Sequence, residues 1–154
     1  MKHYVLILII TLFSISCKDA KQNKTNENDD TSIKTTPTPE LIEIGCYEYL
    51  ANGSSIKLMI TKTEPIIAGD LNYRLKEKDA NTGSFSGKVE GDKLFGTYTF
   101  MSEGIESTRE IAFKISDGKL IEGFGELNSD GTTFKNHKNL EYNDNMPLTK
   151  TECQ

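Results

Sequence analysis

Apolar and polar residues alternate along most of the chain after residue 41. Within residues 67–77, apolar side chains at Ile67, Leu71, Tyr73 and Leu75 alternate with polar ones. This period of two is typical of a β-strand with one face in a core and one in water. The same period recurs at residues 56–61, 85–89, 94–100 and 111–115, and no stretch shows a convincing helical period.

Turn signals separate these strands at short, even intervals. They are rich in Gly, Asn, Asp and Pro and lie at residues 51–53, 63–65, 79–83, 90–92, 117–118 and 129–131. Such spacing predicts about eight short antiparallel strands joined as hairpins. We therefore expect an all-β fold, an up-and-down barrel of about eight strands, with a β-sandwich as the alternative.

Glycines interrupt the predicted strands at Gly69, Gly87, Gly96, Gly123 and Gly125. They would weaken a flat sheet, but they suit bends and close backbone approach in a coiled one. This favours the barrel over the sandwich.

The first 17 residues, MKHYVLILIITLFSISC, have the layout of a secretory signal peptide. Lys2 and His3 precede an apolar run, and Ser14 and Ser16 come just before Cys17. A membrane-spanning helix, the alternative, needs roughly 20 apolar residues, and this run is shorter.

The same segment resembles the lipobox signal of bacterial lipoproteins, although Ser14 stands where that motif usually has Leu. The resemblance implies that Cys17 is acylated and becomes the mature N-terminus; otherwise Cys17 is an ordinary residue of the leader. Several acyl chains would anchor the protein stably to a membrane. We expect a lipid-anchored protein of the bacterial cell envelope, in the outer membrane, on its periplasmic or surface side.

Residues 18–40 contain no aromatic residue and only Ala20 and Ile33 as apolar content. Such a segment cannot bury enough surface to offset its ordering entropy. The expected organisation is a signal peptide at 1–16, a lipidated N-terminus and disordered tether at 17–40, and a β-barrel domain at 41–154.

Charge and length narrow the choice of partners. The chain has 18 basic and 23 acidic residues and a formal net charge of −5, and loss of the leader would remove Lys2 as well. Nucleic acid is therefore not an expected partner, because its binding relies on Lys and Arg. The length suits one folded domain, which we expect to be monomeric.

Three cysteines are present, at Cys17, Cys46 and Cys153. If Cys17 carries lipid, Cys46 and Cys153 remain at the two ends of the folded part, in an oxidising compartment. We predict a disulfide between them that fastens the closing seam of the barrel, and two free buried thiols are the alternative.

The most informative polar stretch is MSEGIESTRE, residues 101–110. Running the alternation of residues 111–115 backwards places Arg109 on the inner face and Glu110 on the outer one. A charged inner group should be paired, and Glu103 across the hairpin is the candidate partner. Arg109 either holds an anionic or carbonyl-bearing ligand at the barrel mouth, or it has a structural role in a salt bridge or on the ring of Tyr98.

Catalysis and metal binding have little support. A nucleophile needs a base, and His137 is the only histidine after the leader. No cluster of His and Cys is present, and Asp79–Gly83 matches only half of a calcium loop. We expect no enzyme activity, no metal and no cofactor.

The predicted barrel resembles lipocalin- and avidin-like barrels and the small barrel lipoproteins that inhibit lysozyme. Gly45-Cys46-Tyr47 lies where lipocalins carry Gly-x-Trp, with Tyr in place of Trp. Ser102-Glu103-Gly104 and Arg109-Glu110 are also similar to a pattern in bacterial lipoproteins of small β-barrel type.

Two functions follow from these expectations. The first is a binding module for a small apolar or amphipathic molecule, with Glu103, Arg109, Glu110 and Tyr98 as candidate binding residues. The second is a filled barrel that binds an envelope protein or inhibits a basic hydrolase such as a lysozyme.

Overall fold

The structure, a computed structural model, describes residues 42–154 as an antiparallel barrel with short connections. The predicted signal peptide, Cys17 and the 18–40 tether lie outside the described residues. The strands are β1 (Gly45–Ala51), β2 (Ser54–Lys62), β3 (Ile67–Arg74), β4 (Asn81–Glu90), β5 (Lys93–Ser102), β6 (Ile105–Ser116), β7 (Lys119–Phe124), β8 (Glu141–Tyr142) and β9 (Leu148–Thr151), and a single 3-10 turn, η1, spans His137–Asn139.

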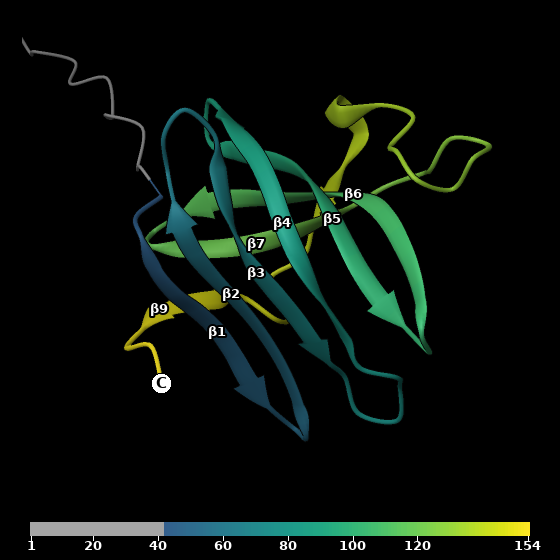
Figure 1. Cartoon of the computed structure of the whole chain (residues 1–154). Helices are drawn as coiled ribbons and strands as arrows, with labels where there is room; N and C mark the ends of the chain where they lie inside the picture. The colour runs from purple at the N-terminus through teal and green to yellow at the C-terminus, as the bar shows by residue number, and fades with distance from the viewer. Residues whose placement is uncertain (1–41) are drawn as a thin grey trace, which may run out of the picture. The chain divides into compact units, whose positions relative to one another are not determined.

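Eight of these strands close into a barrel, which confirms the predicted all-β fold (Figure 1). Strands β1 to β7 pair in sequence order, and β9 inserts between β7 and β1 to complete the ring. The ninth strand, β8, pairs with the end of β7, where Gly123 lies opposite Tyr142. This excludes the β-sandwich, because a single sheet closes into a ring through the pairing of β6 with β7.

The predicted disulfide between Cys46 and Cys153 is present and lies at the closing seam. Cys46 of β1 pairs with Thr151 of β9, so the bridge joins the first strand to the end of the last. The bonded cysteines are 107 residues apart in the sequence.

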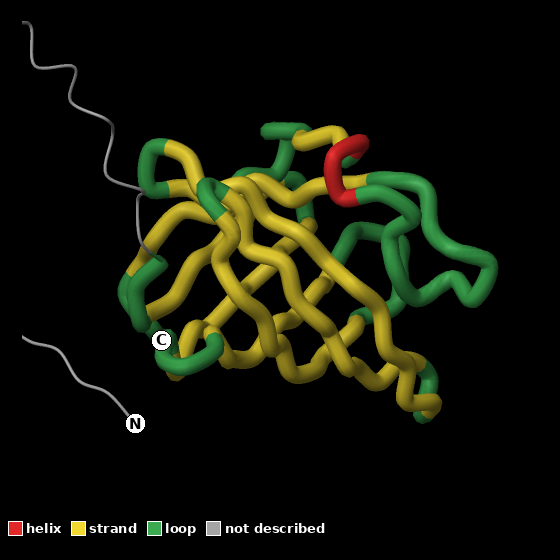
Figure 2. The backbone as a smooth tube through the Cα atoms, turned by 90° about the horizontal axis from the view of Figure 1, so that it is seen from above, coloured by secondary structure: helices red, strands yellow, loops and turns green. Residues whose placement is uncertain are grey.

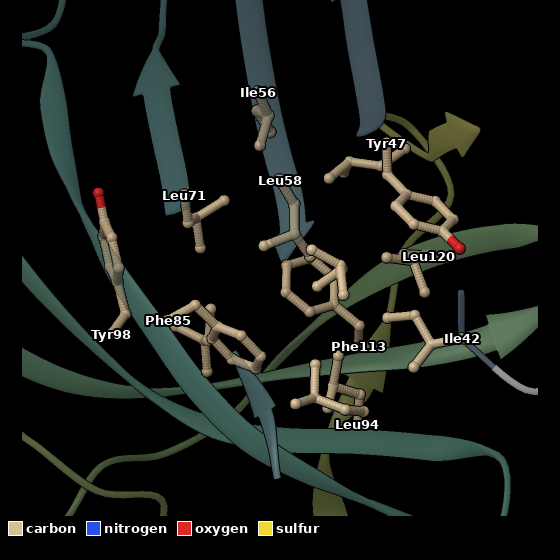
Figure 3. Packing of buried hydrophobic residues seen from close by; sticks show 14 of the residues in the cluster. Ile42, Tyr47, Ile56, Leu58, Leu71, Phe85, Leu94, Tyr98, Phe113 and Leu120 are labelled. Atoms are coloured by element: carbon tan, nitrogen blue, oxygen red, sulfur yellow. The ribbon is translucent and has the colours of Figure 1, made fainter. Parts of the chain in front are cut away.

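The inner face of the barrel carries the apolar residues that the alternation predicted. Tyr98, Phe85, Phe113 and Leu58 are almost completely buried and meet in one cluster (Figure 3). The rings of Phe85 and Phe113 meet edge to face, with centroids 6.5 Å apart, an arrangement that aromatic pairs favour. The middle of the barrel is therefore filled by side chains.

Two of the predicted strand glycines make room for this core. Gly87 and Gly96 are paired across β4 and β5, and a Cβ on Gly96 would overlap the ring of Phe85. The absence of side chains at both positions lets the large Phe85 ring lie flat against the wall.

The two ends of the barrel differ. Because consecutive strands are antiparallel, the turns at 63–66, 91–92 and 117–118 lie at one end, and Ile42, only 8 % exposed, packs into the core there. The turns at 52–53, 75–80 and 103–104 lie at the other end, toward the lower right of Figure 1. We call this second end the open end.

Three predicted boundaries were wrong. Strand β3 stops at Arg74, because Glu77 adopts a left-handed backbone and Lys78 N–H donates to Leu75 C=O in a turn. The predicted turn at 79–83 is shorter, since β4 already pairs from Asn81 onward. Gly125 follows β7 rather than interrupting it.

Candidate binding site at the open end of the barrel

Arg109 lies on the inner face of β6, toward the open end. Its guanidinium carbon is 5.3 Å from the ring centroid of Tyr73, 5.7 Å from that of Tyr98 and 5.5 Å from that of Phe100. These distances are those of cation–π contacts. Tyr98 is the residue directly opposite Arg109 on β5, so the strand register brings the two together.

Glu122 is the second charged residue on this inner face. It lies on β7, only 8 % exposed, and accepts a hydrogen bond of 2.8 Å from the hydroxyl of Tyr73. Burial raises the pKa of the Glu122 carboxyl, while the Tyr73 hydrogen bond and the positive charge of Arg109 act in the opposite direction. Burial and the nearby Glu122 carboxylate also raise the pKa of Tyr73 well above its ordinary value.

Several polar atoms around these two charges have no hydrogen-bond partner among the described residues. They are Arg109 Nε, Asn81 Oδ1 and the hydroxyl of Tyr98, all buried. Burial raises the pKa of Tyr98 to about 12, so its hydroxyl is protonated and can donate. No described carboxylate forms a direct ion pair with Arg109. Buried polar groups are usually satisfied, so an unpaired cluster of this kind marks a candidate ligand site.

Arg109, Asn81 and Glu122 border a hollow of about 530 Å³ at the open end, which we call the mouth cavity. Tyr73, Asn81, Arg109 and Glu122 contribute its buried polar groups. Its apolar walls come from Ile56, Leu75, Phe124 and Met146. Apolar walls with a few convergent polar groups, in this range of volume, are typical of small-molecule sites.

A smaller hollow of about 160 Å³, the side groove, lies where β6 and β7 separate. The two strands pair only between Ala112 opposite Gly123 and Ser116 opposite Lys119. Arg109, Glu122 and Phe124 border both hollows, so the side groove and the mouth cavity share a wall that contains both charges.

The closed end has a hollow of about 340 Å³ beside Ile42 and the turn at 63–66. Its charged residues, Glu64 and Lys88, are both exposed. It offers no buried polar group to orient a ligand, and so the chemistry favours the open end.

The predicted pairing of Arg109 with Glu103 is wrong. Ser102 pairs with Ile105, which leaves Glu103 and Gly104 as a two-residue turn with φ of 50° and 80°. Positive φ at both positions is the I′ hairpin turn. Glu103 is thus exposed at the hairpin tip, whereas Arg109 lies opposite Tyr98, further along the strand.

Glu110 lies on the outer face of β6 and fastens a loop there. Its carboxylate contacts His137 Nε2 at 2.9 Å and accepts the N–H of Phe134 at 2.8 Å. The His137 ring stacks on Phe95 with centroids 4.5 Å apart. In Figure 2, η1, drawn in red, lies beside the strands, and the green part of the loop extends away from them. Glu110 therefore serves the loop rather than the mouth cavity.

Glu122, Tyr73 and Asn81 were missed as site residues. Glu122 carried a usable signal, because it occupies an inner position between Leu120 and Phe124 in a period of two. An acidic residue at an inner position predicts a buried charge, by the same argument that applied to Arg109. The hairpin at residues 117–118 brings β7 next to β6 and so places the two charges on neighbouring strands.

Comparisons of this chain with protein-family models, with curated proteins and with solved structures found no match. Among residues 42–154, no group of three or more His, Cys, Asp or Glu side chains is placed to hold a metal ion. No helix in the described part of the chain is long and apolar enough to cross a membrane.

Proposed function

We propose that this protein is a lipid-anchored, non-catalytic binding module of the bacterial cell envelope that holds a small amphipathic molecule at the open end of its barrel. The leader and Cys17 support the location. The mouth cavity supports the binding role, because apolar walls surround a few buried polar groups there.

The observation that carries the proposal is that Arg109 Nε is buried and has no hydrogen-bond partner among the described residues. A buried guanidinium nitrogen without a hydrogen-bond partner is costly, typically 1–3 kcal/mol for an unsatisfied group. Arg109 faces a cavity of ligand size, so a bound acceptor would remove this cost. A purely structural arginine would more simply be paired within the protein.

Native mass spectrometry of the full chain, purified from its own cells without detergent, tests the proposal. We expect an additional mass that disappears on denaturation. The Arg109→Met variant should lose this mass, whereas Arg74→Met, at an exposed position of β3, should retain it. Retention of the ligand by a destabilised Arg109→Met variant would leave only a structural role for Arg109.

A second function, inhibition of a basic hydrolase such as a lysozyme, is favoured by the tip of the β5–β6 hairpin. Met101 and Ile105 are 47 % and 68 % exposed there, beside the acidic Glu103. If this tip binds an enzyme, the purified chain should inhibit lysozyme, and Ile105→Ser should abolish inhibition without releasing any ligand from the mouth cavity.

A further inference from the structure

The mouth cavity and the side groove together have the shape of a site for a head group with a chain. The side groove has apolar walls at Ile111, Leu127 and Phe134, and its charged lining residues are Arg109, Glu110 and Glu122. A ligand with its polar group at these charges can therefore direct an apolar chain between β6 and β7, where the strands are unpaired.

The charges of the site constrain the head group. Glu77, Lys78 and Asp79 also line the mouth cavity but are exposed to solvent, which screens their charges. Arg109 is positive and Glu122 is the acidic residue buried beside it, so an added anion would lie close to a carboxylate in a poorly solvated place. An added cation would lie close to the guanidinium. An uncharged head group avoids both penalties and leaves the two protein charges to offset each other.

The unpaired atoms indicate what the head group must offer. Arg109 Nε is a donor and needs an acceptor, whereas Asn81 Oδ1 is an acceptor and needs a donor. An alcohol offers both on one atom, whereas an amide presents the acceptor and the donor on separate atoms, so it can serve Arg109 Nε and Asn81 Oδ1 at the same time.

We infer that the ligand is an acyl amide, whose carbonyl oxygen accepts from Arg109, whose N–H serves the acceptors of the mouth cavity, including Asn81, and whose alkyl chain lies in the side groove. This inference rests on the proposed binding function and specifies its ligand. It involves no covalent step.

Calorimetric titration of the full chain with four probes of equal chain length tests the head group. The probes are octanamide, N,N-dimethyloctanamide, octanoate and octylammonium, at pH 7.5. Octanamide should bind at least about tenfold more tightly than each of the others, because each lacks the donor or adds a charge. Arg109→Lys, which keeps the charge but removes Nε, should weaken the binding of octanamide by about tenfold. Arg74→Lys should leave this binding unchanged.

The chain position has its own test. Leu127→Ala removes part of the groove wall and should weaken octanamide several-fold, with little effect on butanamide, whose chain is too short to fill the groove. Leu50→Ala changes another exposed leucine outside both hollows and serves as the matched control.

The outcomes separate this inference from the proposed function. Tightest binding of octanoate or octylammonium would overturn the amide and leave the binding function standing. If none of the four probes binds, the inference of an acyl amide ligand is wrong as well. The proposed binding function would then stand only if the chain purified from its own cells carries a ligand. Equal effects of Leu127→Ala and Leu50→Ala would overturn the chain position.

Discussion

Glu122 is buried and Arg109 is half-buried on neighbouring strands of the barrel wall, and each changes the electrostatic environment of the other. Burial favours the protonated form of Glu122, and the Arg109 charge favours the ionised form. The raised pKa of Glu122 shows that burial is the stronger of the two effects. Ionisation of Glu122 is therefore linked to the stability of the fold.

We predict that Glu122→Gln removes a pH dependence from the free energy of unfolding. Below the ordinary pKa of 4.5, Glu122 is protonated in both the folded and the unfolded state, so its ionisation does not change the free energy of unfolding. As the pH rises from this ordinary pKa to the raised pKa of the folded state, the unfolded chain ionises first, so the wild type loses stability relative to the variant; above the raised pKa the loss is constant. Urea unfolding at pH 4 and pH 8 measures this difference.

Glu106→Gln, an exposed position of β6, should show no such pH-dependent difference. A gap between wild type and Glu122→Gln that is constant across this pH range would contradict the raised pKa.

At the scale of elements, β6 has two different halves. Residues 112–114 pair with β5 on one side and β7 on the other, whereas residues 105–111 pair with β5 alone. Glu110 partly replaces the missing strand, because its N–H donates to Thr132 C=O at 2.6 Å and its carboxylate binds Phe134 N–H and His137.

We predict that Glu110→Ala loosens the loop at residues 126–140 while the barrel stays folded. Removal of two hydrogen bonds to a carboxylate should raise amide exchange of Phe134 by at least about tenfold, with the β2 and β3 amides unchanged. Hydrogen exchange followed by NMR measures this. Glu106→Ala, on the same face of the same strand, is the control, and equal exchange in both variants would refute a fastening role for Glu110.

At the scale of the whole molecule, the barrel depends on one short seam. Strand β9 has four residues and holds β1 to β7, and the Cys46–Cys153 bridge lies beside it. The bridge closes a very long loop, so it should restrict the unfolded chain strongly.

We predict that the double variant Cys46→Ala, Cys153→Ala loses about 4 kcal/mol of unfolding free energy, the size expected for a loop of this length. Urea unfolding measures the loss, and reduction of the wild type should reproduce most of it. The same reductant should leave the double variant unchanged. A loss below about 1 kcal/mol would mean that β9 holds the seam without the bridge.

Much of this fold was predictable because its determinants are local. Alternation placed Phe85, Tyr98 and Phe113 inside, and Gly-rich turns cut the chain into hairpins. The inner position of Arg109 followed from the same alternation, whereas the cysteine pair followed from the number of cysteines and the expected oxidising compartment. The end of β3 was misplaced, because Glu77 adopts a left-handed backbone that its residue type does not announce.

The sequence by itself determined which residues face inward, because a period of two follows directly from strand geometry. It did not determine which inner residues meet across the barrel. Arg109 and Glu122 are thirteen positions apart on different strands, and Tyr73 joins them from the opposite side of the ring. The β6–β7 hairpin places Arg109 and Glu122 on neighbouring strands. Only ring closure brings Tyr73 of β3 to them, because long-range contacts depend on how the sheet curves and where it closes.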